Sequence, residues 1–120
     1  MPKKLPRSVA NRSPCAVATA LDLVGDKWTL LIIRDIGFFA RHHNKDFRQR
    51  VESIPSNILA SRLKMLLENG LIQSIPYQNN RLRYECFLTE SGQGLLPVVK
   101  EMAKCGEVHV AGSRMPRRLQ

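Results

Sequence analysis

The sequence predicts a mainly α-helical protein with a small β-hairpin wing (α+β), arranged as a dimeric winged helix-turn-helix. Three observations predict this fold class. Segments with apolar residues at helical spacing lie on both sides of a break at Ile54-Pro55. Two strand-like runs then follow, and a turn rich in asparagine joins them. The order of the elements is therefore helix, turn, helix and hairpin, with a further helix after the hairpin.

The length allows one domain, and the two ends differ from the middle in composition. The chain has 120 residues, of which 43% are hydrophobic, which is enough for one modest core. Residues 1–14 and 111–120 are rich in basic residues and contain prolines, so we expect a flexible basic N-terminal arm and a flexible basic C-terminal tail. Residues 15–110 are then expected to form the single folded domain, the winged helix-turn-helix.

The positive charge is unevenly distributed. The formal net charge is +9, of which the two ends carry +7. Residues 41–83 carry a net +5, whereas residues 15–40 and 84–110 are slightly acidic, at −1 and −2. One basic stretch between acidic neighbours is typical of a surface that faces a polyanion, although a solvated basic face would give the same count.

The first two helices are predicted from helix-forming residues and capping signals. Residues 15–23 favour a short helix that Gly25 ends, and Asp26 suits the N-cap of the next helix. That next helix has a largely apolar face and is predicted to be the core helix. The face comprises Trp28, Leu31, Ile32, Asp35 and Ile36.

The helix-turn-helix itself is predicted over residues 46–69. Phe47 and Val51 give an apolar pair at i, i+4 in a short helix over residues 46–52, and Pro55 breaks it. Ser56 can cap the following helix, which Gly70 ends. The apolar side of this helix consists of Leu59, Leu63, Leu66 and Leu67.

The wing and the last helix follow. Residues 71–77 and 82–88 read as two strands around the turn 78–81, which places Arg81 and Arg83 at or near the tip. Thr89 can cap a last helix, and Pro97 is expected to kink or restart it. Its apolar residues predict a dimerisation surface, although packing against the Trp28 helix would explain the same pattern. They are Leu95, Val99, Met102 and Gly106.

The polar face of the helix after Pro55 predicts a sequence-specific reader of double-stranded DNA. A recognition helix needs a narrow polar face that pairs with base edges and phosphates in the major groove. The face comprises Ser56, Asn57, Ala60, Ser61, Arg62 and Lys64. The wing arginines Arg81 and Arg83 suit the minor groove or backbone, and Lys45 and Arg48 suit the DNA backbone. An ordinary solvated helix face remains the alternative for each of these residues.

Four blocks of sequence resemble the HxlR-type regulators, which are relatives of the MarR group. The blocks are residues 15–35, 58–64, 69–72 and 84–98, and the resemblance extends over residues 15–109. It implies a transcription regulator. We expect a repressor, with an activator as the open alternative. The resemblance also implies a homodimer formed through the first and last helices that binds a palindromic operator. A two-fold pair doubles the base contacts of a single module.

The three cysteines are too far apart, and too few, for a disulfide scaffold or a zinc site. Some relatives of the family sense oxidants or electrophiles through a cysteine at the position of Cys15. A helix N-terminus and nearby Arg12 favour a thiolate there. A small, chemically inert residue is the alternative. Cys86 is expected in the core, and Cys105 in the last helix can face a partner.

Other functions find little support in the sequence. His42, His43 and His109 are not spaced as a catalytic triad or as metal ligands, so we expect neither an enzyme, nor a metal, nor a cofactor. The chain has no apolar run that could span a membrane, so a soluble cytoplasmic protein is expected, with a small molecule or an oxidant as inducer. The alternative function is a winged-helix module that binds RNA or another protein.

Overall fold

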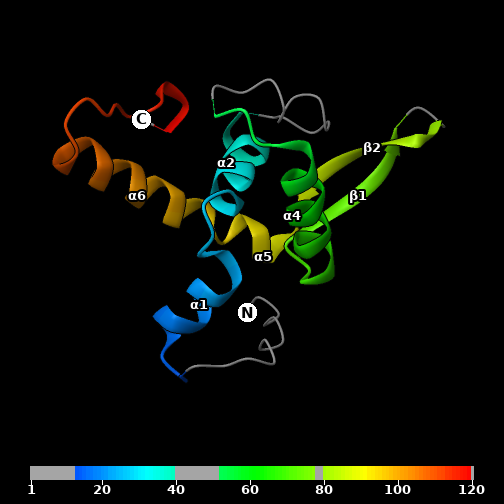
Figure 1. Ribbon diagram of the computed structural model, residues 1–120, viewed down its shortest axis with the longest axis horizontal. Helices are drawn as coiled ribbons and strands as arrows, with labels where there is room; N and C mark the ends of the chain where they lie inside the picture. Colours follow the sequence, from blue (N-terminus) through cyan, green and yellow to red (C-terminus); the bar gives the residue numbers. More distant parts are fainter. Residues whose placement is uncertain (1–12, 40–51, 78–79, 120) are drawn as a thin grey trace.

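The computed structural model describes residues 13–39, 52–77 and 80–119, with only the backbone described at residue 77 and residues 80–84. Helix α2 lies at the centre, with α6 on one side of it and the β-hairpin on the other (Figure 1). The elements are α1 Ala16–Val24, α2 Thr29–Phe39, α4 Ser56–Glu68, β1 Ile72–Tyr77, β2 Asn80–Leu88, α5 Glu90–Gln93, α6 Leu96–His109 and the 3-10 helix η1 Arg117–Leu119. The architecture confirms the predicted mainly helical fold with a two-stranded hairpin. The expected arm over residues 1–12 and most of the expected helix over residues 46–52 lie outside the described residues.

Helix α2 is the core helix, as predicted. Most of it is buried, and its buried residues are Thr29, Ile32, Ile33, Arg34, Asp35 and Ile36. The Asp26 carboxylate accepts hydrogen bonds from the backbone N–H groups of Trp28 and Thr29, at 3.0 and 3.1 Å, so it caps the N-terminus of the helix. The apolar face extends further round the helix than the sequence pattern indicates, because two layers cover it. The hairpin contacts one side and α6 contacts another.

Helix α4 begins one residue earlier than the predicted cap implies. Ser56 is its first residue, Pro55 is the N-cap, and no side chain caps the helix, so the prediction that Ser56 caps it is wrong. Pro55 suits the position because its φ of −60° is fixed by the ring and its carbonyl accepts the first helical hydrogen bond, from Leu59 N–H at 2.9 Å. Leu59 and Leu66 are fully buried and fix the inner side of the helix.

The predicted ends of α4 and of the hairpin are confirmed. Gly70 follows α4 with a φ of 73°, a left-handed conformation that favours glycine. The Thr89 hydroxyl accepts a hydrogen bond from Gly92 N–H, at 3.2 Å, and caps α5. Pro97 lies in the first turn of α6, so the proline restarts the helix after the break at Gly94 and Leu95.

The C-terminal segment differs from the expected flexible tail. Ser113 Oγ donates to the carbonyls of Gly106 and Val110, and Met115 N–H donates to Glu107 Oε2 at 2.9 Å. The segment thereby folds back along α6, and Leu119 in η1 is buried in the core (Figure 1). The physical reason is that Met115 and Leu119 are apolar and cover the groove between α2 and α6. Arginines flank these two apolar residues in the sequence, so the segment has no regular spacing of apolar residues that would predict its burial.

Candidate nucleic-acid interface

The outer face of α4 is an exposed polar stripe that we call the α4 stripe. Its members are Asn57, Ala60, Ser61 and Lys64, which are spaced at i, i+3, i+4 and i+7 and are all exposed. Ser56, at the start of the helix, is exposed as well. Because Leu59 and Leu66 hold the opposite side in the core, the stripe cannot turn inward. The structure therefore brings the predicted recognition residues onto one accessible face, with Arg62 as the exception.

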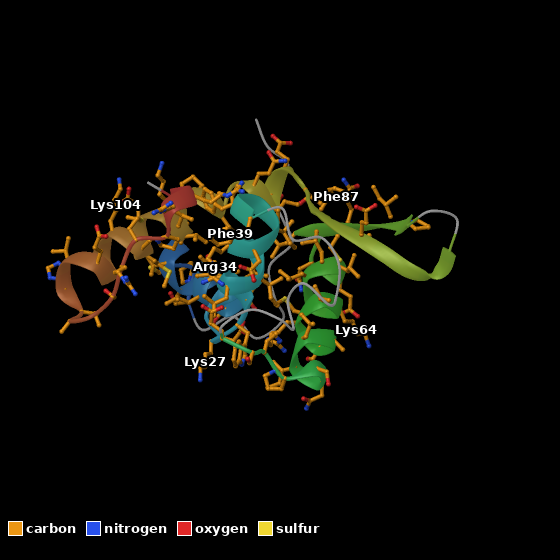
Figure 2. All side chains as sticks on the ribbon, turned by 90° about the horizontal axis from the view of Figure 1, so that it is seen from above. Lys27, Arg34, Phe39, Lys64, Phe87 and Lys104 are labelled. Atoms are coloured by element: carbon orange, nitrogen blue, oxygen red, sulfur yellow. The ribbon has the colours of Figure 1, made fainter. Side chains whose placement is uncertain are left out.

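Lys64 is the most accessible of the charged residues of α4. Its side chain is 78% exposed, and Nζ lies 3.9 Å from Glu68 Oε1 one turn along the helix. Figure 2 shows the Lys64 side chain pointing away from the body of the protein. A pair this exposed is weak, so the ammonium group can exchange its glutamate partner for a phosphate at little cost.

Arg62 lies on the flank of the stripe rather than in it. Its Nη1 is 3.6 Å from Asp26 Oδ1, and its Nη2 donates to Ser61 Oγ at 3.2 Å. The side chains of Arg62 and Asp26 are each about one third exposed. The predicted DNA-contacting arginine is thus also an intramolecular link between α4 and the start of α2. Sequence reasoning missed the link because its two ends are 36 residues apart.

Asp26 is ionised in this setting for clear reasons. Partial burial by itself raises the pKa of the carboxyl group. Hydrogen bonds from the Thr29 hydroxyl and from the N–H groups of Trp28 and Thr29, together with the charge of Arg62, outweigh burial, so the pKa of Asp26 lies below its ordinary value. The α2 N-terminus therefore holds a fixed negative charge beside α4.

A cleft lies between the start of α2 and the first turns of α4. Its volume is about 340 Å³, and it is lined by Asp26, Trp28, Asn57, Ile58, Ser61 and Arg62. Lys27 is exposed beside it, with Nζ 5.2 Å from the centre of the Trp28 ring. Lys27 and Lys64 both lie at the lower edge of the molecule in Figure 2, well away from Lys104 on α6. Lys27 is thus a further cation near the α4 stripe that sequence reasoning did not single out.

The wing carries its two predicted arginines in β2. The strands pair from Ile72 with Leu88 to Pro76 with Tyr84, and the register then shifts so that Tyr77 pairs with Asn80. Residues 81–83 of β2 therefore form an irregular stretch near the tip, and a bulge of this kind redirects side chains. The side chains of Arg81 and Arg83, and the whole of Lys45 and Arg48, lie outside what the structure describes.

A buried ion-pair network joins α2 to the segment that enters α4. Arg34 donates to both carboxylate oxygens of Glu52, at 3.3 and 2.9 Å, and its Nε donates to Asp35 Oδ1 at 3.0 Å. Burial by itself lowers the pKa of Arg34, but the two carboxylates outweigh it and raise that pKa. The spacing of apolar residues did not predict this network, because Arg34 falls outside the predicted face and Glu52 lies 18 residues away in the chain.

The predicted dimerisation residues divide between two environments. Val99 is buried in the protomer core, which corrects its assignment to the dimer surface, and Leu95 is half-buried against the same core. The reason is that α6 packs on α2, the intramolecular alternative for this face. Met102 is 57% exposed, and Gly106 lies beside the C-terminal segment.

Helices α1 and α6 expose several large apolar side chains, which together we call the α1–α6 patch. It comprises the exposed residues Val17, Leu21, Val98, Met102, Val108 and Val110. In Figure 1, α6 extends from the body on the side opposite the hairpin, and α1 extends below the body. Large apolar side chains exposed on projecting helices are typical of a protein–protein contact.

The three cysteines differ in their surroundings, and all are free. Cys15 is the exposed N-cap of α1, where hydrogen bonds from the backbone of Ala18 and then Val17 lower the pKa of its thiol. Cys86 is buried, as predicted, and burial raises its pKa. Cys105 is exposed on α6.

Among residues 13–39, 52–77 and 80–119, no three His, Cys, Asp or Glu side chains are placed to hold a metal ion. In those same ranges, no helix combines the length and apolar character needed to cross a membrane.

Comparison with known proteins identifies relatives of the whole folded region. The family model described as HxlR-like helix-turn-helix matches residues 23–113. An uncharacterized HTH-type transcriptional regulator of Mycobacterium tuberculosis is 38% identical over 95 residues, which are 79% of this chain and 59% of that protein. The chain therefore spans less than two thirds of the length of that relative.

Solved structures agree with the family match. A protein described as a candidate MarR-family transcriptional regulator from Porphyromonas gingivalis superposes with a TM-score of 0.72 and 30% identity, covering 87% of this chain and all of that one. The redox regulator HypR in its reduced form superposes with a TM-score of 0.69 and 26% identity, covering 81% and 95%. All three relatives are described as regulators rather than as enzymes.

Proposed function

The chain belongs to the HxlR-like helix-turn-helix family, and on that premise we propose that it is a transcription regulator that binds double-stranded DNA at a palindromic operator. One observation carries the proposal. The α4 stripe is polar, narrow and exposed, while Leu59 and Leu66 lock the other side of the helix into the core. Such a helix fits the major groove, where Asn57 suits adenine and Lys64 suits a phosphate. Repression is the mode that we propose, by occupation of a promoter.

The active form that we propose is a homodimer. A single module of this size makes too few base contacts for operator-level specificity, and a two-fold pair doubles them. The α1–α6 patch supplies apolar surface for the contact, with Val17 and Met102 among its most exposed members. The Val99 side of α6 contributes stability to the protomer instead.

We propose that Cys15 makes the regulator responsive to oxidants or electrophiles. The thiol is exposed, its pKa is lowered by backbone hydrogen bonds, and it begins the helix that carries Val17 of the α1–α6 patch. A modification at Cys15 would therefore alter dimer geometry and with it the spacing of the two recognition helices. HypR, a structural relative, is described as a redox regulator. The test measures release from DNA against oxidant concentration for the wild-type protein and for Cys15→Ser. Release of both proteins at the same oxidant concentration would contradict this role.

The decisive experiment for DNA binding is genomic footprinting of the purified protein, followed by selection of duplexes from a random pool. Operator binding predicts enrichment of one palindrome, and binding that persists in excess non-specific competitor DNA. The alternative, a winged-helix module for RNA or another protein, predicts no enriched duplex. It also predicts that all nucleic-acid binding disappears together as salt rises.

A further inference from the structure

The carboxylate of Asp26 is held rigidly by the end of α2. It accepts two backbone N–H groups, those of Trp28 and Thr29, and it also accepts the Thr29 hydroxyl. Thr29 is fully buried, so these partners do not move with the surface. Of the two members of the Asp26–Arg62 pair, Asp26 is therefore the fixed one and Arg62 the movable one.

Arg62 has space in which to move. The pair lies between two clefts, the 340 Å³ cleft beside Asn57 and Ser61, and a second one of about 220 Å³ beside Leu21 and Met65. The Nη1–Oδ1 distance of 3.6 Å is long for a charged hydrogen bond, and both side chains reach solvent. A contact of this kind is weak enough for a well-placed phosphate or guanine to replace it.

The position of the pair decides what it does to DNA binding. Arg62 flanks Ser61 in the α4 stripe, so its guanidinium can reach a duplex that the stripe contacts. Asp26 places a negative charge 3.6 Å from the guanidinium, which reduces the attraction that Arg62 would exert on a passing phosphate. Lys64 pairs with the highly exposed Glu68, so the same helix carries one restrained cation and one accessible cation.

We propose that Asp26 is a specificity-determining residue, which restrains Arg62 during non-specific contact and yields it only to a duplex that fits the rest of the α4 stripe. This inference rests on the proposed function as a DNA-binding regulator. Non-specific binding depends on the number of phosphates that free cations neutralise, so a restrained arginine lowers it. In the fitted complex, several contacts form together and the guanidinium exchanges Asp26 for DNA. Asp26 thereby increases the difference in affinity between a duplex that fits the α4 stripe and one that does not.

The key variant is Asp26→Asn, because asparagine caps a helix as well as aspartate does but carries no charge. Binding is measured by fluorescence anisotropy on two duplexes, one selected from a random pool by the wild-type protein and one scrambled version of it. Each duplex is titrated at salt concentrations from 50 to 200 mM. Thermal unfolding of every variant is recorded alongside, and Asp26→Ser, a second neutral cap, replaces the asparagine variant if that one is unstable.

On the scrambled duplex, we expect Asp26→Asn to steepen the plot of log affinity against log salt by about 0.9, the value for one additional phosphate contact. This corresponds to roughly a threefold larger loss of affinity across that fourfold salt range. Affinity for the selected duplex should change less, so the ratio of the affinities for the two duplexes should fall, and it should fall most at the lowest salt concentration. In an Arg62→Ala background the same substitution should have no effect on the slope.

Glu101→Gln is the matched control. It also removes one carboxylate from a surface ion pair, that of Glu101 with Lys104 at 3.1 Å, but on α6, away from α4 (Figures 1 and 2). An equal change in slope for this variant and Asp26→Asn would reduce the effect to net charge and overturn the inference. Persistence of the Asp26→Asn effect without Arg62 would overturn it too. Failure of the wild-type protein to enrich any duplex would instead refute the proposed function itself.

Discussion

Arg34 and Glu52 are joined by two hydrogen bonds, Nη1 to Oε2 at 3.3 Å and Nη2 to Oε1 at 2.9 Å, although 18 residues separate them in the chain. The arginine is buried in the middle of α2, and the glutamate precedes Pro55 at the entrance to α4. This bidentate pair therefore fixes the segment that leads into α4, the proposed recognition helix. Two substitutions separate what each partner contributes.

Arg34→Ala should lower the free energy of unfolding by about 3–5 kcal/mol, because it leaves the buried carboxylate of Asp35 without its arginine. Asp35 is only 4% exposed. Glu52→Gln should cost about 1 kcal/mol, because the Glu52 side chain is 35% exposed and Arg34 keeps Asp35. Urea unfolding followed by circular dichroism measures both. Equal losses for the two variants would mean that Asp35 does not depend on Arg34.

Asn57→Ala and Lys64→Gln should affect DNA binding in different ways. Asn57 is placed for a base edge, so its loss should reduce discrimination between selected and mismatched duplexes at one base pair, by about 1–3 kcal/mol. Lys64 is placed for a phosphate, so its loss should weaken all duplexes alike and flatten the salt slope by about 0.9. Competition binding over a salt series distinguishes the two. If Lys64→Gln alone altered base preference, the assignment of roles within the α4 stripe would be wrong.

Gly92→Ala should destabilise the protein far more than Gly94→Ala, although the two glycines are only two residues apart. A Cβ at Gly92 would lie 2.1 Å from the carbonyl oxygen of Leu71, a backbone atom that cannot yield. A Cβ at Gly94 would lie 3.2 Å from the carbonyl oxygen of Ser91, and the Gly94 φ of −61° suits alanine. Thermal unfolding should show a large fall in melting temperature for Gly92→Ala and a small change for Gly94→Ala. Equal changes would indicate that α5 shifts away from Leu71 to make room.

Local signals in the sequence account for most of the fold. Asp26, Gly70 and Thr89 each act through hydrogen bonds or backbone angles set within a few residues, and the structure confirms all three at their predicted positions. Spacing of apolar residues likewise identified α2 as the core helix. The predicted N-cap of α4 is wrong by one residue, because Pro55 and Ser56 both suit a helix start and only the backbone angles distinguish them.

Tertiary contacts account for what the sequence did not predict. The pairs Asp26–Arg62 and Arg34–Glu52 join residues distant in the chain, and a periodic pattern carries no information about such partners. The α4 stripe was predictable because helical spacing alone places its members on one face. The ion pair between Arg62 and Asp26 was not predictable, because it depends on how α2 and α4 pack. Leu119 was assigned to a flexible tail because a single leucine among arginines gives no periodic signal.

Cys15 should react with iodoacetamide much faster than Cys86. Its lowered pKa gives it a larger thiolate fraction at neutral pH than an ordinary thiol, and the thiol is exposed. The rate should therefore rise with pH and level off at a lower pH than for a free cysteine. Cys86 is buried, and its raised pKa keeps it protonated, so it should react only after unfolding. Peptide mass spectrometry over a pH series measures both rates. Equal labelling of the two in folded protein would refute the thiolate assignment at Cys15.

Met102→Lys and Val99→Ala, three residues apart on α6, should separate assembly from folding. Met102 belongs to the exposed α1–α6 patch, so a lysine there should raise the dimer dissociation constant at least tenfold, while the melting temperature of the protomer changes little. Val99 is buried against α2, so truncation should lower the free energy of unfolding by roughly 2 kcal/mol without weakening a dimer that stays folded. Sedimentation velocity and urea unfolding measure the two effects.

Val17→Lys on α1 should reproduce the Met102→Lys result, because the proposed dimer contact uses both helices. A dimer that survives both lysine substitutions would have to form through a different surface, and the spacing of its recognition helices would then have to be inferred anew.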